Sequence, residues 1–501
     1  MISSSSAKSL SNSTIEHLGE RVLRPTYDRT KLRPHTVHIG VGSFHRAHQA
    51  VYLDDLLQRR VLTDWGECGM GVLPHDVGIR NALRDQDFYY TVLERSENDQ
   101  TARVVGSIID FALAPEGIEH AIDRLADQDT RLVSLTITEG GYFINEGSGN
   151  FSAEHPSIQH DIRQPTHPIT SIGLISAALR RRRDDGLPPF TVMSCDNLQG
   201  NGHVMRQVLL GLAELQEPAL ARWISENVAF PNCMVDRITP ATTASDAEEL
   251  RSAFGIVDAW PVVTEPFRQW VIEDMFCNGR PPWEEVGAEM VSDVLPYELM
   301  KMRLLNASHM AMAYLGALAG HTFAHEVIRD SVFDQFIRAF MDEVTPIVPI
   351  IPNVSVKLYK NTLIERFANP TINDRVARLC SEGSAKMPKW VLPSAVELAE
   401  AQRPNRLLAL AIAGWIRYLQ AAKDDQGNAI EVVDARAAEL RLVAGELGDD
   451  PRPFLALNFL FGSAYFVESD FASEVERALK SLRIFGARKT LRAYTDQVNR
   501  G

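Results

Sequence analysis

Apolar and polar positions follow two different periods in the two halves of the chain. In the first half, short apolar runs rich in β-branched residues alternate with segments of helical spacing. These runs are 36–42, 68–73, 131–138 and 190–197. Such an alternation of strands and helices is typical of a parallel α/β sheet. Two further strand-like runs, which could pair as a hairpin, are 88–95 and 103–113.

After about Asp293, helical periodicity takes over and the signals for strands nearly vanish. The helical segments are 297–320, 331–348, 406–422, 434–447 and 471–486. Pro281, Pro282 and Pro296 interrupt the chain between the two regions, so we expect the domain boundary within 279–297. The pattern therefore predicts an α/β N-terminal domain followed by a mostly α-helical C-terminal domain.

Composition and charge narrow the classes of partner. The chain has 501 residues, 45% hydrophobic and 23% charged, which is ordinary for a globular protein. Its formal net charge of -14 argues against nucleic acid or an anionic membrane as a partner. The five scattered cysteines form no CxxC pair, so we expect neither a disulfide framework nor a structural zinc site. With no signal-like segment and no apolar run of about 18 residues, the expectation is a cytoplasmic protein.

A glycine turn in "HIGVGSFHRAH" follows the first predicted strand and precedes a segment of helical spacing, 45–60. Gly40 and Gly42 would let a pyrophosphate approach the backbone and the helix N-terminus. His45 replaces the third glycine of the GxGxxG fingerprint, and a turn without a ligand would explain two glycines equally well. The strand-turn-helix setting favours a dinucleotide site. The expected cofactor contacts are Ile39, Gly40, Val41, Gly42, Phe44, His45 and Arg46.

This turn makes the N-terminal domain a Rossmann-type candidate. The expected division is a flexible arm at 1–30, a dinucleotide-binding domain at 31–290 and a helical substrate and catalytic domain at 291–501. A dinucleotide fold also needs an acid after its second strand, and Asp76 is the candidate. Its charge would disfavour the 2′-phosphate of NADP, which predicts NAD as the cofactor. The alternative is a solvated aspartate in a loop.

The segment "KMRLLNASHM" carries polar groups into an apolar helical run. On an ideal α-helix, Glu298, His309 and Asn306 lie about 60°, 80° and 140° from Lys301, on one broad face. A carboxylate, an imidazole, an amide and an amine gathered among apolar residues suit a pocket. A surface stripe or a satisfied core network is the alternative.

Further polar residues follow strands of the predicted sheet. Asp196 and Asn197 are the polar last residues of the run 190–197, and Glu139 directly follows the run 131–138. Ligands of open α/β sheets bind at the carboxyl ends of the strands. Asn197 and Glu139 are therefore candidates for a ligand site, whereas Asp196 is expected to be a turn residue or a helix cap.

Six motifs, in order between about residues 36 and 400, resemble the polyol-specific long-chain dehydrogenase family. They are "GVGSFHRAH", "TITEGGYF", "SCDNLQGNG", "FPNCMVDRITP", "VTEPFRQWVIED" and "KMRLLNASH". The resemblance implies a monomeric, metal-independent enzyme that transfers hydride between NAD and a polyol, with D-mannitol and D-fructose as the expected pair. D-Arabinitol oxidation, or fructuronate or tagaturonate reduction, is the alternative within the family. A dinucleotide-binding protein without catalysis is the alternative outside it.

The resemblance also implies roles for single residues. Lys301 matches the general base, Asn197 and Asn306 match an oxyanion hole, and His309 matches a residue that orients the substrate. The remaining matches are cofactor contacts at Glu139 and Asp236, an acid near the site at Glu298, and substrate contacts at Arg378 and Lys386. An acidic substrate would need a dedicated cation, which Arg378 or Lys386 could provide.

Overall fold

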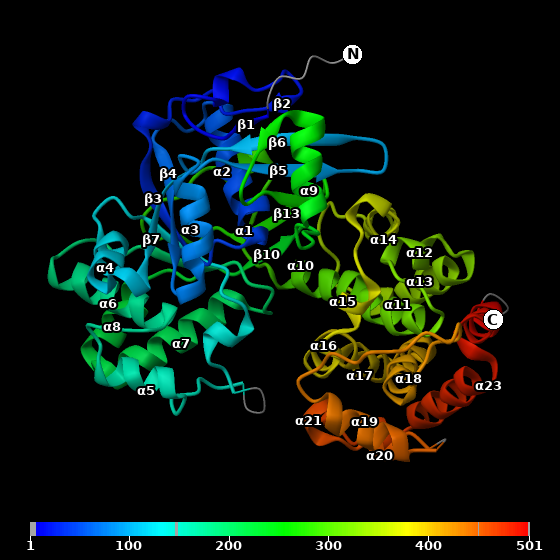
Figure 1. The fold of residues 1–501 in the computed structure, drawn as a ribbon. Helices are drawn as coiled ribbons and strands as arrows, with labels where there is room; N and C mark the ends of the chain where they lie inside the picture. The colour runs from blue at the N-terminus through cyan, green and yellow to red at the C-terminus, as the bar shows by residue number, and fades with distance from the viewer. Residues whose placement is uncertain (1–6, 146–148, 449, 499–501) are drawn as a thin grey trace, which may run out of the picture. The chain divides into compact units, whose positions relative to one another are not determined.

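In the computed structural model, residues 7–145, 149–448 and 450–498 are described, and the chain divides into two compact units, Met1–Leu295 and Pro296–Gly501 (Figure 1). The N-terminal unit holds all fourteen described strands together with several helices, and the C-terminal unit is helical. This is the Rossmann-type domain followed by a mostly helical domain that the sequence predicts, so the predicted fold class is confirmed.

The main sheet of the N-terminal unit is parallel throughout and has the strand order β7-β4-β3-β8-β9. Its strands are β3 (Arg33–Ile39), β4 (Trp65–Gly71), β7 (Ile108–Leu113), β8 (Leu132–Leu135) and β9 (Thr191–Ser194). Numbered along the chain, these strands lie in the Rossmann order 3-2-1-4-5. The order reverses between β3 and β8, and that switch point is where such sheets bind their ligands.

The sheet separates two cores because side chains alternate along each strand. In β3, Val37 and Ile39 pack with the helices α4 (Ile118–Ala126), α6 (Ser171–Asp184) and α7 (Asn201–Gln216). Figure 1 shows these three helices grouped on one side of the sheet. The other helices of this unit are α1 (Ser43–Ala47), α2 (Gln49–Gln58), α3 (Val77–Arg84), α5 (Pro156–Arg163), α8 (Pro218–Asn227) and α9 (Ala244–Glu249).

Three smaller sheets complete the N-terminal unit. The predicted hairpin is confirmed by the antiparallel pair β5 (Tyr90–Arg95) and β6 (Gln100–Val105), which lies between β12 (Val262–Thr264) and β2 (Val22–Leu23). The run 103–113 is two strands, however, because the chain turns at Gly106, whose N–H donates to Asp54 Oδ1 at 3.0 Å, before β7 enters the main sheet. The remaining strands are β10 (Cys233–Asp236), β13 (Gln269–Glu273) and β14 (Glu289–Val291) in one sheet, and β1 (Lys8–Ser9) and β11 (Ile256–Val257) in the other.

The N-terminal segment differs from the expected flexible arm at 1–30. Of its described residues, β1 pairs with β11, and Leu10, Ile15 and Leu18 are buried in a core with Phe254. The serine-rich composition suggested mobility, but three apolar side chains find partners about 240 residues further along the chain. Burial of each contributes about 1.5–3 kcal/mol, which is enough to hold a short segment.

The helix predicted at 45–60 is two helices, α1 and α2, separated at His48. The backbone of His48 leaves the helical region at φ -123° and ψ -88°. Its Nε2 lies 2.9 Å from the carbonyl oxygen of Gln269 on β13, so a contact to another sheet accompanies the break. Ala47, Val51 and Leu57 are buried as the periodicity predicts.

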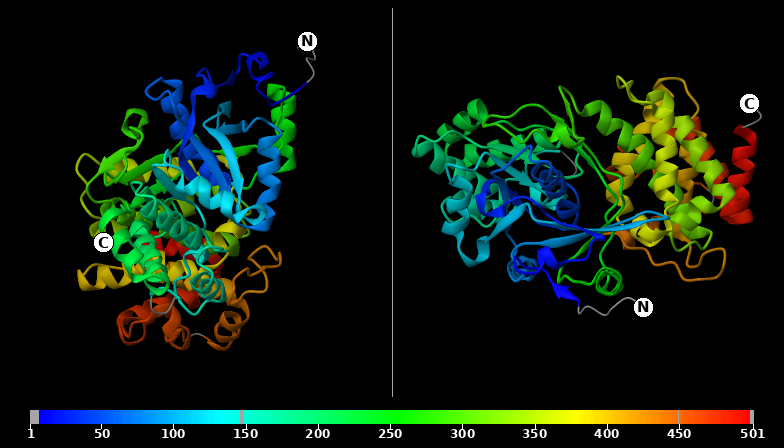
Figure 2. Two further views of the ribbon diagram at one scale, coloured as in Figure 1. Left: turned by 90° about the vertical axis from the view of Figure 1, so that its left-hand side faces the viewer. Right: turned by 90° about the horizontal axis from the view of Figure 1, so that it is seen from above.

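The C-terminal unit packs its helices around α11 (Ala307–Leu318) and α18 (Arg406–Gln420), which are buried over most of their length. In Figure 2 the C-terminal part of the chain, coloured yellow to red, is made of helices. The others are α10 (Leu295–Met300), α12 (Ala324–Arg329), α13 (Ser331–Val344), α14 (Val356–Phe367), α15 (Val376–Cys380), α16 (Gly383–Trp390), α17 (Leu392–Glu400), α19 (Ala437–Glu446), α20 (Arg452–Leu455), α21 (Asn458–Phe461), α22 (Tyr465–Glu468) and α23 (Asp470–Val498). Within α23 the backbone breaks at Gly486, whose φ of 75° is left-handed.

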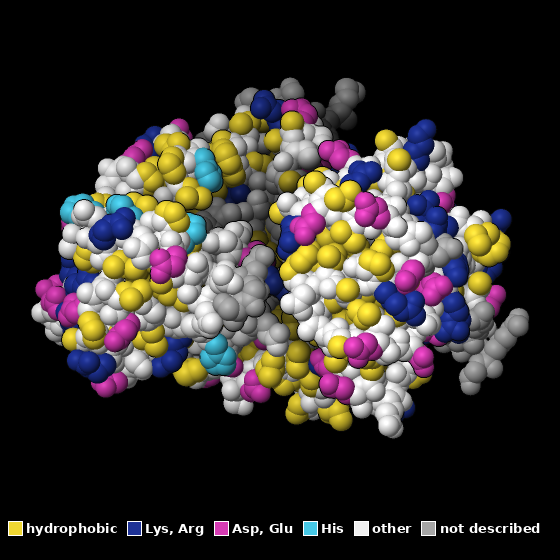
Figure 3. Space-filling model, turned by 90° about the horizontal axis from the view of Figure 1, so that it is seen from below, with side chains coloured by type: hydrophobic (Ala, Val, Ile, Leu, Met, Phe, Trp, Pro, Cys, Tyr) yellow, Lys and Arg dark blue, Asp and Glu magenta, His cyan; other side chains and the backbone are white. Residues whose placement is uncertain are grey.

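The surface mixes charges of both signs. On the face drawn in Figure 3, lysine and arginine side chains are interspersed with aspartate and glutamate side chains. Among the described residues, no helix is both long enough and apolar enough to cross a membrane.

Candidate active site

The glycine turn lies at the switch point of the main sheet, at the carboxyl end of β3. Gly40 has a left-handed φ of 90°, and a Cβ there would lie 2.2 Å from the carbonyl oxygen of Thr136, so only glycine fits. Gly42 is exposed at the start of α1, and a Cβ there would meet nothing closer than Gly40 O at 3.9 Å. The space beside Gly42 is therefore open, which fits the close approach of a pyrophosphate to the backbone.

His45 explains the departure from the third glycine of the fingerprint. Its buried ring stacks on His38 of β3 with centroids 3.4 Å apart, and its Nε2 lies 2.6 Å from Oε1 of Glu67 on β4. Burial lowers the pKa of His45 from 6.5 to about 3 and raises the pKa of Glu67 from 4.5 to about 7, so the pair is neutral near pH 6. The third glycine of the fingerprint lets the helix pack closely on the strand. Here the stacked and hydrogen-bonded ring of His45 fills that space between α1 and β3.

The predicted side chains around the turn mostly face the protein interior. Arg46 is buried, donates to the carbonyl oxygen of Trp260 and lies over the ring of Tyr90. Phe44 stacks on His48. A cofactor at this turn would therefore meet the backbone, not the side chains of His45 and Arg46.

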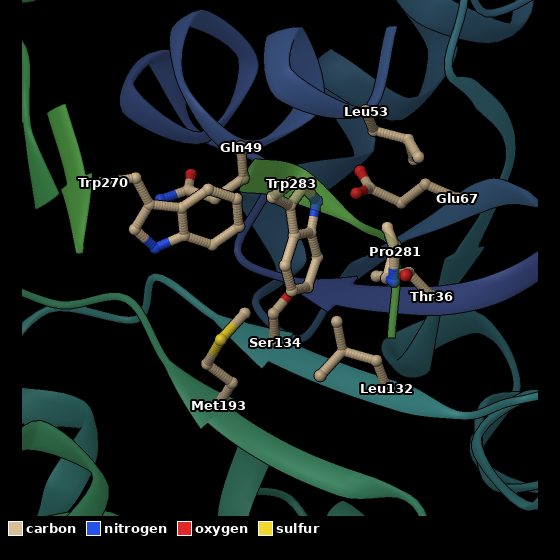
Figure 4. Close-up of a pocket in the computed structure, with 10 residues that line it drawn as sticks. All are labelled: Thr36, Gln49, Leu53, Glu67, Leu132, Ser134, Met193, Trp270, Pro281 and Trp283. Carbon is tan, nitrogen blue, oxygen red and sulfur yellow. The ribbon is translucent and has the colours of Figure 1, made fainter. Parts of the chain in front are cut away.

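A pocket between the main sheet and α2 is too small to be the dinucleotide site. Figure 4 shows Glu67 from β4 and Gln49 from α2 reaching into it, with Trp283 across from them. Its cavity volume is about 10 Å³, far below the roughly 300–1,000 Å³ of pockets that enclose a drug-sized ligand. The open carboxyl edge of the sheet remains the better place for a dinucleotide.

Asp76 has a structural role besides the predicted one. Its Oδ2 accepts the backbone N–H groups of Val72 and Leu73, both at 2.9 Å, and so closes the turn after β4. The side chain is partly exposed. Contact with a ribose stays a prediction.

The other candidates of the N-terminal unit follow strands. Glu139 is exposed at the start of the 3-10 helix η5 (Glu139–Tyr142) after β8, and Asn197 is exposed after β9. Asp236 is the buried last residue of β10. Asp196, which we expect from the sequence to be a turn residue or a helix cap, accepts backbone N–H groups of the neighbouring loop after β8. Sequence reasoning missed this contact because it joins two strands.

Lys301 and Asn306 bound a π-helical turn, Lys301–Asn306, between α10 and α11. The ideal α-helix used for the expected angles is therefore wrong here. In a π-helix the hydrogen bonds run from i to i+5, so residues five apart lie one turn above each other. This brings Lys301 and Asn306 closer to a common face than an α-helix would, and such turns occur frequently at functional sites.

The side chains of this turn are buried. Lys301 is 7% exposed and Asn306 is 4% exposed, and Glu298 on α10 is buried as well. Among the described residues, Nδ2 of Asn306 has no hydrogen-bond partner. Leaving such a donor unsatisfied costs about 1–3 kcal/mol, so a ligand acceptor would satisfy it. The ring of His309 is half-buried against Phe367, with centroids 4.5 Å apart.

Arg303 is a residue of this turn that sequence reasoning missed. Its buried guanidinium donates to the carbonyl oxygen of Ile347 and to Glu397 on α17. The only signal in the sequence was its place in the motif "KMRLLN". Arg303 joins the π-helical turn to two neighbouring segments.

The candidate substrate contacts lie on α15 and α16, which pack against α11 and the π-helical turn, respectively. Arg378 forms a bidentate pair with Asp374, with both N···O distances 2.7 Å, and its side chain is 56% exposed. Lys386 is half-buried, with Nζ 3.4 Å from the carbonyl oxygen of Leu379. Arg378 thus already faces a carboxylate. Among the described residues, no three histidine, cysteine, aspartate or glutamate side chains gather as a metal site.

The chain matches two family models that together cover most of its length. The "Mannitol dehydrogenase Rossmann domain" matches residues 34–285, and the "Mannitol dehydrogenase C-terminal domain" matches residues 293–483. Two curated relatives are mannitol 2-dehydrogenases. The protein of Neosartorya fischeri is 46% identical over 95% of this chain and 96% of its own, and that of Aspergillus oryzae is 46% identical over 97% and 98%.

Two solved structures share the whole fold. Pseudomonas fluorescens mannitol 2-dehydrogenase, in a ternary complex with NAD and D-mannitol, has a TM-score of 0.90 and 43% identity over 98% of this chain and 100% of that chain. A D-sorbitol dehydrogenase in substrate-free form has a TM-score of 0.88 and 35% identity over 96% and 100%. Together with the family models, these likenesses show that the chain belongs to the mannitol dehydrogenase family.

Proposed function

We propose that the protein is an NAD-dependent polyol dehydrogenase that oxidises D-mannitol to D-fructose and catalyses the reverse reduction. The observation that carries the proposal is the buried amide of Asn306, which has an unsatisfied donor on the same π-helical turn as the buried amine of Lys301. The likeness to the Pseudomonas fluorescens complex, which contains NAD and D-mannitol, supports the cofactor and the substrate.

The residues of the N-terminal unit fit NAD. The open backbone at Gly42 suits a pyrophosphate, and a carboxylate at Asp76 would bind ribose hydroxyls and repel the 2′-phosphate of NADP. NAD supplies a hydride acceptor for the alcohol carbon. Glu139, which follows β8, and Asp236, the last residue of β10, are the further cofactor contacts that we propose.

Lys301 has the properties that a general base requires. It must be neutral to take the proton of the substrate hydroxyl, and burial of an amine favours its neutral form. A nearby carboxylate favours the charged form, so Glu298 would tune the pKa of Lys301 or, as the family resemblance implies, pass its proton on. Asn306 and Asn197 would donate N–H groups to the reacting oxygen, and one such donor contributes about 3 kcal/mol to transition-state stabilisation. His309 would orient the substrate.

A neutral polyol suits the described cations better than a uronate does. A carboxylate substrate would need an arginine or lysine available for it, whereas both arms of the Arg378 fork are bonded to Asp374. Arg378, through the N–H groups that are not bonded to Asp374, and Lys386 are therefore proposed as contacts to substrate hydroxyls. The proposal includes a metal-independent reaction, because the amine and the amides supply the polarisation that a metal would provide elsewhere.

The test is a set of initial rates followed by NADH absorbance. Mannitol, sorbitol and arabinitol would be oxidised, and fructose, fructuronate and tagaturonate reduced, each with NAD(H) and with NADP(H). We expect the highest kcat/KM for mannitol and fructose with NAD(H). Faster turnover of a uronate would move the substrate class, and NADH binding without turnover of any polyol would favour a non-catalytic binding protein.

We further propose that the enzyme is a monomer, as the family resemblance implies, and that it is cytoplasmic. Size-exclusion chromatography with light scattering should give the mass of one chain, 55.8 kDa. A mass of twice that value would contradict the monomer.

A further inference from the structure

Thr138 adopts a backbone conformation that threonine rarely takes. Its φ is 61° and its ψ is 167°, in a region that is essentially restricted to glycine. For a β-branched residue a positive φ is an outlier, and the strain costs about 1–3 kcal/mol. Two glycines, Gly140 and Gly141, follow within three residues, so the strain falls on Thr138 although the segment contains residues that would tolerate it. Such strain persists only where the surroundings enforce it.

Asp196 enforces this conformation from the neighbouring strand end. Its Oδ1 accepts the N–H of Thr138, and its Oδ2 accepts the N–H of Ile137, both at 2.9 Å. The hydroxyl of Tyr142 donates to the same Oδ2 at 2.6 Å. The carboxylate therefore holds the turn both before and after Glu139.

This arrangement places the carboxylate of Asp196 in the protein interior, where its charged form is disfavoured. Asp196 is 8% exposed, and burial is the main cause that raises its pKa above the ordinary value, although the three donors lower it in part. The hydroxyl of Tyr142 is fixed in turn, because Ser194 Oγ lies 2.5 Å away. Stabilisation of a loop alone requires neither a buried carboxylate nor a strained backbone, and here both occur together.

We propose that Asp196 is a positioning residue: by holding the strained turn at Thr138 it places Glu139, and by its own position it places Asn197, at the cofactor edge of the sheet. The inference rests on the proposed function, in which Glu139 contacts the cofactor and Asn197 the reacting oxygen. Asn197 follows Asp196 directly in the chain, so one residue sets the place of two candidate groups that follow the adjacent strands β8 and β9.

The chain offers a matched control in Asp161. This aspartate on α5 is 0% exposed and accepts the same kinds of donor, two backbone N–H groups and one hydroxyl: the N–H groups of Ile169 at 2.8 Å and Thr170 at 3.1 Å, and the hydroxyl of Thr170 at 2.6 Å. It closes the turn before α6, which carries none of the candidate site residues. A purely structural role would make the two aspartates equivalent.

The experiment compares Asp196→Asn with Asp161→Asn. Both variants should unfold at lower temperature than the wild type, because each leaves one backbone N–H without its acceptor. Only Asp196→Asn should raise the Kd for NADH and lower kcat/KM, by about 10- to 100-fold, since small displacements at a reacting centre have effects of this size. Equal changes of Kd and kcat/KM in the two variants, at matched stability, would overturn the proposal.

A second variant separates strain from positioning. Thr138→Gly removes the backbone strain, so Thr138→Gly combined with Asp196→Asn should regain thermal stability relative to Asp196→Asn alone. NADH affinity should not recover, because glycine permits the turn without fixing it. Recovery of both properties would overturn the positioning role. If the wild-type protein binds no NADH, the proposed function fails, and this inference fails with it. The titration of NADH does not depend on turnover, so it tests cofactor binding separately from catalysis.

Discussion

Arg303 and Glu397 join the π-helical turn to α17. The guanidinium of Arg303 bonds to the carboxylate of Glu397 and to the carbonyl oxygen of Ile347, while Lys301 and Asn306 occupy the two ends of the same turn. A π-helical turn is rare, and it depends on its surroundings more than an α-helix does. The buried arginine therefore stabilises the local geometry on which the proposed base and its partner amide depend.

Replacing Arg303 should separate this role from ordinary stability. Arg303→Lys keeps the charge but loses the planar fork, so we expect the free energy of unfolding to fall by about 1–3 kcal/mol. We also expect a lower kcat with a nearly unchanged Kd for NADH. Urea unfolding and initial rates measure the two effects. The control is Arg338→Lys, at an exposed pair with Asp334, where both should stay near wild type.

Lys301→Ala should remove the proposed base. Turnover should fall by about 10²–10⁴-fold, the usual contribution of general acid-base catalysis, while the Kd for NADH stays at its wild-type value. Steady-state rates and fluorescence titration of NADH measure the two quantities. Near-normal turnover would show that another group takes the proton.

Asn306→Ala should lower the rate in both directions by about 10²–10³-fold, as for the loss of one oxyanion donor. Its stability should change little, because the deleted Nδ2 has no partner among the described residues and its desolvation is already unfavourable. Chemical unfolding together with mannitol oxidation and fructose reduction checks this. If only the Kd for the cofactor changes, Asn306 lies outside the reacting centre.

The pair of Glu67 and His45 predicts how stability depends on pH. Because burial raises the pKa of Glu67 from 4.5 to about 7, its contribution is present below pH 4.5 and is lost as the pH rises through 7. The lowered pKa of His45 acts in the opposite sense, and its contribution is lost as the pH falls from 6.5 toward 3.

Glu67→Gln removes the first effect and keeps a donor for His45. The free energy of unfolding of the variant minus that of the wild type should be higher at pH 8 than at pH 5, by up to about 3 kcal/mol. Urea unfolding at the two pH values measures the difference. Curves for variant and wild type that run parallel between pH 5 and pH 8 would mean that the buried carboxyl does not titrate in this range.

Asp76→Ala should change cofactor choice and stability together. Loss of the carboxylate removes the repulsion of a 2′-phosphate, so the ratio of kcat/KM for NADP to that for NAD should rise. The N–H groups of Val72 and Leu73 lose their acceptor, which should lower the free energy of unfolding by about 1–3 kcal/mol. An unchanged ratio alongside the stability loss would leave Asp76 with its structural role alone.

Several features follow from local sequence alone. The apolar, β-branched run of β3, the glycine pair before α1 and the helical periodicity after residue 293 were sufficient to predict a Rossmann-type domain followed by a helical one. Glu298, Lys301, Asn306 and His309 could be placed near one another because they lie within twelve positions of the same helical run. Local periodicity reports which face of a segment is buried, and that does not require knowledge of its neighbours.

Other features depended on the tertiary structure. The hydrogen bonds of Asp196 to the turn at Thr138 and the burial of Leu10 beside β11 join segments that are far apart in the chain. They exist because β3, β8 and β9 become neighbours in the sheet and because the N-terminal segment finds a partner strand. Hydrogen bonds between distant residues leave no periodic trace in the sequence, and a π-helical turn differs from an α-helix by one residue that only its packing selects.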